Sequence, residues 1–127
     1  MRVPYSSITL IISAFLTGLA QQPLQLGWLA WFSLVPFIFV LNRMESKKEY
    51  FMVGFIWGIA DYLTVIFWLA MNIGTTPLIG IISMLAAVIY CALNVAGISV
   101  LVGFLKFHYS KFWFWLLPFV WTAVEYI

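Results

Sequence analysis

Asp61 is the residue best suited to chemistry, because it is a carboxylic acid about midway along an apolar run. Gly54 and Gly58 precede it and Asn72 follows it at spacings that place all four on nearly one helix face. Ionisable groups inside a membrane are costly and often functional, which predicts a polar site facing a bundle or water-filled cavity. The alternative is an Asp that hydrogen-bonds a neighbouring helix where Gly54-x-x-x-Gly58 packs closely. We prefer this alternative, because no basic partner lies nearby.

Cys91 and His108 are the single cysteine and the single histidine of the chain. A cysteine nucleophile needs an adjacent base, whereas seventeen helical residues extend about 25 Å. One cysteine also excludes an internal disulfide and a Cys-based metal site. Asn94, close to Gly97, is typical of an interhelical hydrogen bond. Phosphate-loop, metal-ligand and Ser/His/Asp patterns are absent from the sequence, so we expect no cofactor, no metal and no catalytic residue.

The composition predicts an all-α, polytopic membrane protein. Of the 127 residues, 65% are hydrophobic and only 8% are charged, against roughly 25% charged residues in soluble domains. A short soluble domain could not bury so much apolar surface. The apolar runs are too long and continuous for barrel strands. The basic residues are scattered, which excludes a nucleic-acid partner, and residues 1–127 are expected to form one bundle.

About five transmembrane helices are predicted from the apolar runs, at residues 6–20, 24–41, 50–73, 78–105 and 112–127. The first run follows Arg2 and could be a cleaved signal. Another apolar run follows within a few residues, so a retained helix is preferred. The last run has 16 residues and extends roughly 24 Å, less than the ~30 Å hydrocarbon core. We therefore expect the chain to be the front portion of a longer protein, truncated at its C-terminus.

Basic residues set the predicted orientation, because Lys and Arg gather in cytoplasmic loops. The two turns between these loops carry no basic residue. The basic residues lie before the first helix and in alternate loops, and they are Arg2, Arg43, Lys47, Lys48, Lys106 and Lys111. This pattern predicts an inside N-terminus, five crossings and a C-terminus heading outside.

Tryptophans mark helix ends and one helix interior. Trp28, Trp31, Trp113 and Trp115 open predicted helices, which is typical of the interfacial aromatic belt. Trp57 and Trp68 are eleven residues apart inside the third run and so would share one face. They would line an acyl-chain groove or face lipid, and the sequence leaves both open.

Three blocks resemble the membrane portion of the apolipoprotein N-acyltransferase family. The first combines GLAQQP (18–23) with the aromatic helix start and Val-Pro of 24–36. The second is KEYFMVGFIWG (48–58), followed by Phe-Trp-Leu at 67–69, and the third is LPFVWTAVEYI (117–127). Gln21 and Gln22 depart from the aromatic residue that often precedes the Pro in that family. Trp121 and Glu125 match its Pro-x-x-Trp-x-x-x-Glu stretch.

The resemblance implies transfer of an acyl chain from a phospholipid to the N-terminal cysteine amine of a lipoprotein, in the bacterial cytoplasmic (inner) membrane. In that family the chemistry belongs to a downstream nitrilase-like domain with Glu, Lys and Cys, so no residue here inherits a catalytic role, Cys91 included. The implied partners are membrane lipids, a phospholipid acyl donor and a lipoprotein substrate. Glu125 would satisfy polar groups between helices or touch a lipid headgroup.

Two other classes stay open at this point. One is a non-catalytic membrane anchor or scaffold, for example fused to a glycosyltransferase acting on polyprenyl phosphates. The other is a small transporter or channel around Asp61 and Asn72. A transporter would be expected to show inverted repeats, and we find none in the sequence.

Overall fold

The computed structural model describes residues 4–21, 26–74, 76–109 and 112–126, without the side chains of residues 4–6, Trp31 and Glu125. Arg2, Lys111 and Ile127 lie outside the described residues, as do Gln22 and Pro23 of the GLAQQP block.

The described residues form only helices, which confirms the all-α prediction. Two short 3-10 helices accompany five α-helices: α1 (Pro4–Gln21), η1 (Gly27–Leu29), α2 (Ala30–Asn42), α3 (Lys47–Val65), η2 (Phe67–Met71), α4 (Pro77–His108) and α5 (Trp113–Glu125).

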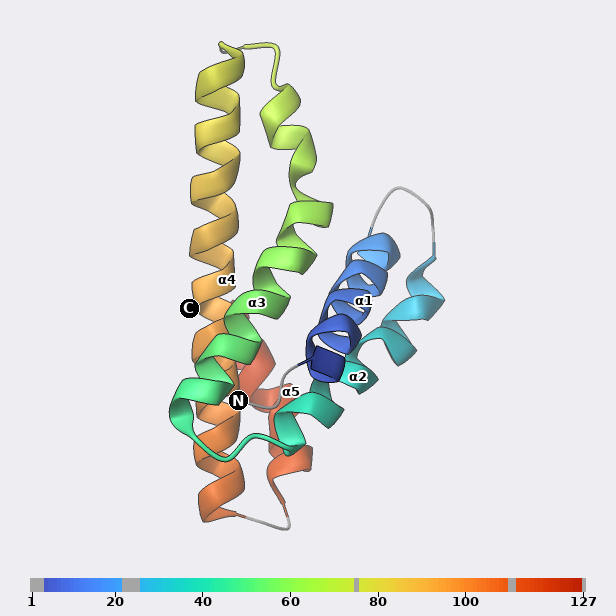
Figure 1. Ribbon diagram of the computed structural model, residues 1–127, viewed down its shortest axis with the longest axis vertical. Coiled ribbons are helices and arrows are strands. Elements are labelled where there is room, and N and C mark those ends of the chain that lie inside the picture. Colours follow the sequence, from blue (N-terminus) through green and yellow to red (C-terminus); the bar gives the residue numbers. More distant parts are fainter. Residues whose placement is uncertain (1–3, 22–25, 75, 110–111, 127) are drawn as a thin grey trace.

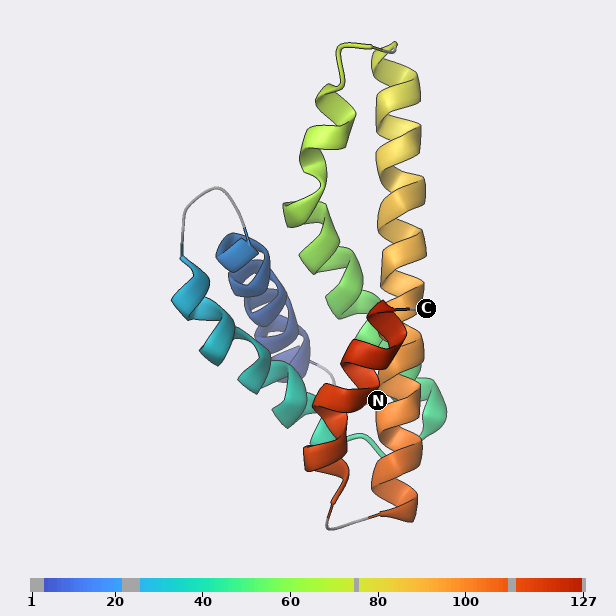
Figure 2. The same cartoon turned by 180° about the vertical axis from the view of Figure 1, so that it is seen from behind.

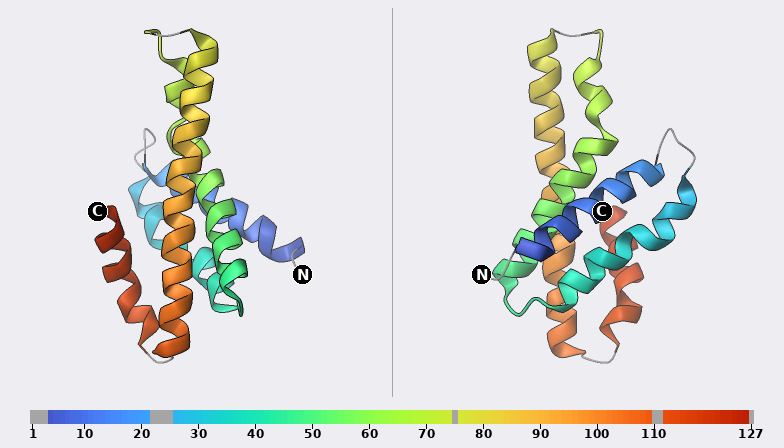
Figure 3. Two further views of the ribbon diagram at one scale, coloured as in Figure 1. Left: turned by 90° about the vertical axis from the view of Figure 1, so that its left-hand side faces the viewer. Right: turned by 45° about the vertical axis from the view of Figure 1, so that its right-hand side comes forward.

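Two antiparallel helix pairs and a fifth helix build the molecule (Figure 1). α3 and η2 run along α4 as a long hairpin, whereas α1 and α2 form a shorter hairpin beside α3. Seen from behind, α5 lies between α2 and the C-terminal half of α4 (Figure 2). The η2–α4 end therefore extends beyond the rest of the bundle (Figure 3).

Local sequence explains where α3 and α4 begin. Ser46 caps α3, because its hydroxyl accepts a hydrogen bond from the Glu49 amide while the Glu49 carboxylate accepts one from the Ser46 amide. α4 starts with Pro77, whose missing N–H is not needed in the first helical turn. α4 has 32 residues and so extends about 48 Å.

The expected continuous helix over residues 50–73 is wrong, because the α-helix ends at Val65 and a 3-10 helix follows. The Thr64 hydroxyl donates to the Asp61 carbonyl at 2.6 Å. Such bonds from a side chain to the preceding turn compete with the backbone ladder and bend helices. At Ile66 the backbone has left helical geometry, with φ −113° and ψ 16°.

Gly54 and Gly58 bring α3 against α4, as their spacing predicts. A Cβ on Gly58 would lie 2.8 Å from the Ala92 Cα, and one on Gly54 would lie 2.9 Å from the Ala96 Cα. Only glycine permits this approach, because the obstructing atoms include backbone Cα atoms of the facing helix, which cannot move aside as the end of a side chain can.

In the described part of the chain, α4 alone is both long and apolar enough to cross a membrane. Three shorter apolar helical stretches accompany it, at residues 7–21, 27–42 and 113–124. Large hydrophobic side chains such as Phe32, Trp68 and Phe119 are mostly exposed on the exterior. The number of crossings and their orientation stay predictions.

The glycine contact leads to a paired test. Gly58→Val is expected to destabilise the protein by roughly 1–3 kcal/mol, because the added atoms overpack against the α4 backbone. Gly97→Val is the matched control, since a Cβ there meets nothing within 4 Å. Thermal unfolding in detergent micelles measures both variants. Equal losses of stability would contradict the close contact.

Candidate functional site

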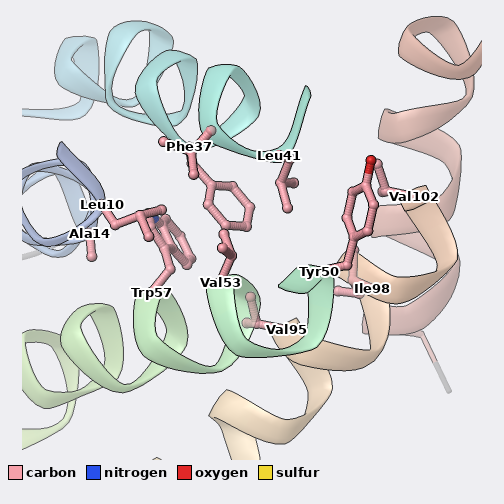
Figure 4. Close-up of a cluster of buried hydrophobic side chains, with 11 residues drawn as sticks. Leu10, Ala14, Phe37, Leu41, Tyr50, Val53, Trp57, Val95, Ile98 and Val102 are labelled. Atoms are coloured by element: carbon pink, nitrogen blue, oxygen red, sulfur yellow. The ribbon is translucent and has the colours of Figure 1, made fainter. Parts of the chain in front are cut away.

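Trp57 belongs to the buried cluster in Figure 4, and only 1% of its surface is exposed. Its ring stacks on Phe37 of α2 at a centroid distance of 4.6 Å and meets Trp121 of α5 edge-on at 6.4 Å. Leu10 and Ala14 of α1 are buried in the same cluster. One side chain of α3 therefore joins three other helices.

A short chain of hydrogen bonds runs through this cluster. The Trp57 indole Nε1 donates to the Ser13 hydroxyl at 3.1 Å, and that hydroxyl in turn donates to the Ser33 carbonyl oxygen. Ser13 and Ser33 are both almost completely buried. Sequence analysis missed both serines. The available signal was a hydroxyl inside each apolar run, because such groups must find a hydrogen-bond partner where water is excluded.

An apolar cleft opens beside Trp121, between α2, α4 and α5. Its volume is about 270 Å³. Apart from the Thr122 hydroxyl its lining side chains are apolar: Leu34, Phe37, Ile38, Leu41, Ile98, Val102, Leu117, Pro118 and Trp121. Such a lining favours hydrocarbon, since it offers a polar guest almost no hydrogen-bond partner.

Asp61 lies buried in α3, with 3% of its surface exposed. Its Oδ1 atom has no hydrogen-bond partner among the described residues. The predicted packing bond to a neighbouring helix is therefore not formed by this oxygen within the described part of the chain. Asn72, expected on the same face, instead lies exposed in the turn after η2, where its side chain accepts a hydrogen bond from Gly74.

The structure also separates Trp57 from Trp68. Trp57 is enclosed in the core, whereas 60% of the Trp68 surface is exposed. The helix break at Ile66 changes the rotation per residue, so an eleven-residue spacing no longer places the two rings on one face. They do not line a common groove.

Cys91, Asn94 and His108 all lie on α4 and are not brought together. His108 stacks on Phe104 one turn away, at a centroid distance of 4.0 Å. Asn94 is exposed, and its amide donates to the Tyr90 carbonyl of its own helix. The expected interhelical bond from Asn94 is thus not formed within the described residues, in which we also find no group of three metal-ligating side chains.

The described basic residues gather at one end of the bundle. Arg43, Lys47 and Lys48 lie at the α2–α3 connection, and Lys106 lies near the end of α4. The Lys106 ammonium donates to the Asn42 carbonyl at 2.5 Å, which ties the two segments together. The turn from η2 to α4 lies at the opposite end (Figure 1).

Comparison with known proteins gives the family. The profile described as the apolipoprotein N-acyltransferase N-terminal domain matches residues 13–127. The chain belongs to this family. The resemblance seen in the sequence is thereby confirmed, although nothing is established for Glu125, whose side chain is not described.

One relative is an apolipoprotein N-acyltransferase from Geobacter metallireducens (strain ATCC 53774 / DSM 7210 / GS-15). It is 28% identical over 134 aligned positions, which cover 91% of this chain and 23% of the relative. The chain thus spans under a quarter of the curated relative's length. No solved structure matches the chain.

The hydrogen-bond chain predicts the effect of losing one hydroxyl. Ser13→Ala leaves the buried Trp57 indole N–H without its acceptor, which costs about 1–3 kcal/mol of unfolding free energy. Ser99→Ala is the matched control, because Ser99 is equally buried but bonds only the Val95 carbonyl of its own helix. Chemical denaturation in mixed micelles compares them. A Ser99→Ala loss as large as that of Ser13→Ala would contradict this role for Ser13.

Glu49 provides a pH-dependent prediction outside the expected spans. Amide hydrogen bonds from Glu45 and Ser46 lower the pKa of Glu49 below its ordinary value of 4.5. The capping contribution is therefore fully present above pH 4.5 and is lost as pH falls through the lowered folded-state pKa. NMR titration of the Glu49 carboxyl should give a midpoint below 4.5, and Glu49→Gln should remove the associated pH dependence of stability. A midpoint at or above 4.5 would contradict the cap.

Proposed function

We propose that these residues form the membrane-embedded N-terminal portion of an apolipoprotein N-acyltransferase. The complete enzyme would transfer an acyl chain from a phospholipid to the N-terminal cysteine amine of lipoproteins, as a multi-pass protein of the bacterial cytoplasmic membrane. The observation that carries this proposal is the family match over residues 13–127. The alignment with the relative covers only 23% of that relative's length.

The distribution of charge and apolar surface supports the membrane assignment. The segments that carry the described Lys and Arg residues lie at one end of the bundle, as expected if that end faces the cytoplasm. Exposed apolar side chains on α2, α4 and α5 would be costly in water and are suited to lipid. α4 is longer than the hydrocarbon core requires and would cross it tilted.

The proposed role of this portion is support and access rather than chemistry. Both substrates of the complete enzyme carry acyl chains, and each methylene group withdrawn from the bilayer costs about 0.8 kcal/mol. An enzyme acting on them must therefore reach them laterally, from within the membrane. The buried network around Trp57 would hold the helices that carry the catalytic domain at the membrane surface.

Asp61 and Trp121 have structural roles in this proposal. Trp121 packs on Trp57 and walls the apolar cleft, so it connects α5 to the core. Asp61 lies in α3 four residues after Trp57, buried next to the helix break. Lipid contact is proposed for the exposed Trp68, and no catalytic step is assigned to any of the three.

The orientation has a direct labelling test. Glu45 and Thr76 are exposed residues at opposite ends of the bundle. In a Cys91→Ser background, Thr76→Cys should react with a membrane-impermeant maleimide in intact spheroplasts, whereas Glu45→Cys should react only after permeabilisation. The reverse labelling pattern would contradict an inside location for the basic end.

The activity itself is tested by complementation. The full-length gene product should restore growth and lipoprotein N-acylation to a bacterium depleted of its own apolipoprotein N-acyltransferase, with mass spectrometry detecting the third acyl chain. Residues 1–127 expressed alone should restore neither, at comparable levels in the membrane. A full-length product that inserts correctly yet leaves the lipoprotein amine unmodified would overturn the proposal and favour an anchor for a different enzyme.

A further inference from the structure

The apolar cleft beside Trp121 has a limited capacity. Its α2 wall extends from Leu34 to Leu41, which is about 10 Å along the helix axis. A helix about 10 Å across would occupy roughly 800 Å³ over that length, whereas the cleft has a volume of about 270 Å³. The cleft is therefore too small for a further helix, and it suits a guest as thin as a single hydrocarbon chain.

The lining of the cleft favours an apolar guest. Side chains from three helices form the walls, and Thr122 alone among the lining residues has a polar side-chain atom free of an aromatic ring. In other proteins an apolar cavity of about 150 Å³ stays free of water and binds small apolar molecules. This cleft is larger, so an apolar guest of greater length can enter it.

A positive charge lies at the basic end of the cleft. Lys106 follows Val102 by one turn on the same face of α4, and Val102 lines the cleft. The Lys106 ammonium bonds the carbonyl of Asn42, the residue after Leu41 at the end of the α2 wall. A second contact, at 3.5 Å, reaches the Met44 carbonyl. An ammonium has three N–H donors, so one donor remains, and no carboxylate in the described part of the chain pairs with it.

The position of Lys106 indicates what kind of guest fits. Lysines at the end of a spanning helix lie at the level of the lipid headgroups, and the hydrocarbon core begins beyond them. Anionic headgroups are attracted to such lysines. A phospholipid with its phosphate at Lys106 would direct an acyl chain past Val102 and then Ile98, which both line the cleft.

We propose that the cleft holds one acyl chain of an anionic phospholipid from the leaflet at the basic end, and that Lys106 binds its phosphate. The lipid fills the space between α2, α4 and α5 and neutralises the ammonium. It is held and not consumed, because the described lining residues include no acid, thiol or imidazole. The proposal rests on the membrane placement of the bundle and does not depend on acyl transfer.

Photolabelling of the full-length gene product in phosphatidylcholine vesicles tests the proposal. The vesicles contain a trace of a probe lipid with a diazirine in its acyl chain, and the probe is either phosphatidylglycerol or phosphatidylcholine. Mass spectrometry of peptides locates the attached lipid after irradiation. The phosphatidylglycerol probe should label cleft residues such as Ile98 and Leu117 several-fold more than the phosphatidylcholine probe does. Leu85, exposed elsewhere on α4, is the control position and should show no such preference.

Two pairs of variants connect the label to the two parts of the site. Lys106→Gln keeps N–H donors for the Asn42 carbonyl but removes the charge, so it should lower the preference for phosphatidylglycerol about five-fold. Lys106→Arg should retain most of that preference. Thr122→Phe adds bulk to the cleft and should lower labelling by both probes. Ala123→Phe adds the same ring one residue outside the lining and should not, and both positions are exposed, so neither ring overpacks the core.

Three results would each overturn the proposal. Equal labelling of the cleft by the two probes would show that no anionic headgroup is recognised. Labelling that Thr122→Phe leaves unchanged would place the bound chain elsewhere. A cleft that takes no lipid label would have another occupant, and a photoreactive phenylalanine at Thr122 would identify the segment of the polypeptide that fills it. Lipoprotein acylation is measured on the same vesicles, so loss of the label with acylation retained contradicts the lipid site alone.

Discussion

A buried indole N–H must find an acceptor, and this requirement at Trp57 organises the bundle. Trp57 lies where neither water nor lipid reaches, so its N–H would cost free energy if left unpaired. The Ser13 hydroxyl accepts this hydrogen bond and donates one of its own to the Ser33 carbonyl oxygen, which fixes α1 and α2 relative to α3. The stacked ring of Phe37 and the edge-on ring of Trp121 add α2 and α5 to the same point.

Small residues determine how the remaining helices approach that centre. Gly54 and Gly58 let the backbone of α4 come within contact of α3 on the side where Trp57 does not project. Gly18 does the same for α1 near the helix break, since a Cβ there would meet the Thr64 side chain. The large side chain of Trp57 and the small residues beside it on α3 thus give this helix two different kinds of neighbour. Beyond Val65, η2 packs mainly against α4 among the described residues.

Features determined within a single helix could be predicted from the sequence. Features that depend on contact between two helices could be predicted less well. Apolar length and the Gly54–Gly58 spacing both follow from local chemistry, and they predicted the all-α class and close packing on that face of α3, although not that α4 would be the partner. The family resemblance was likewise visible in short blocks of Trp, Gly and Pro. The break at Ile66 was not visible, because no sequence pattern marked the bond from the Thr64 hydroxyl to the Asp61 carbonyl that accompanies it.

The same break explains the errors at the candidate site. The prediction that Trp68 shares a helix face with Trp57, and Asn72 with Asp61, assumed an unbroken helix. The break after Val65 therefore made both predictions wrong. Ser13 and Ser33 were overlooked, because the sequence of an apolar run does not indicate which group a serine hydroxyl will bond. The interhelical hydrogen bond predicted for Asn94 is not formed within the described residues, where its amide donates to the Tyr90 carbonyl of the same helix.

The central claim is that a lipid-facing bundle encloses Trp57, and indole NMR signals in lipid nanodiscs test it most directly. Two paramagnetic agents broaden the signals of the groups that they reach. Dissolved oxygen concentrates in the bilayer, whereas a chelated nickel ion stays in water. The account predicts that oxygen broadens the Trp68 indole signal strongly and that neither agent broadens the signal of Trp57 to a comparable degree. Oxygen broadening of Trp57 as strong as that of Trp68, or broadening of Trp68 by nickel alone, would contradict it.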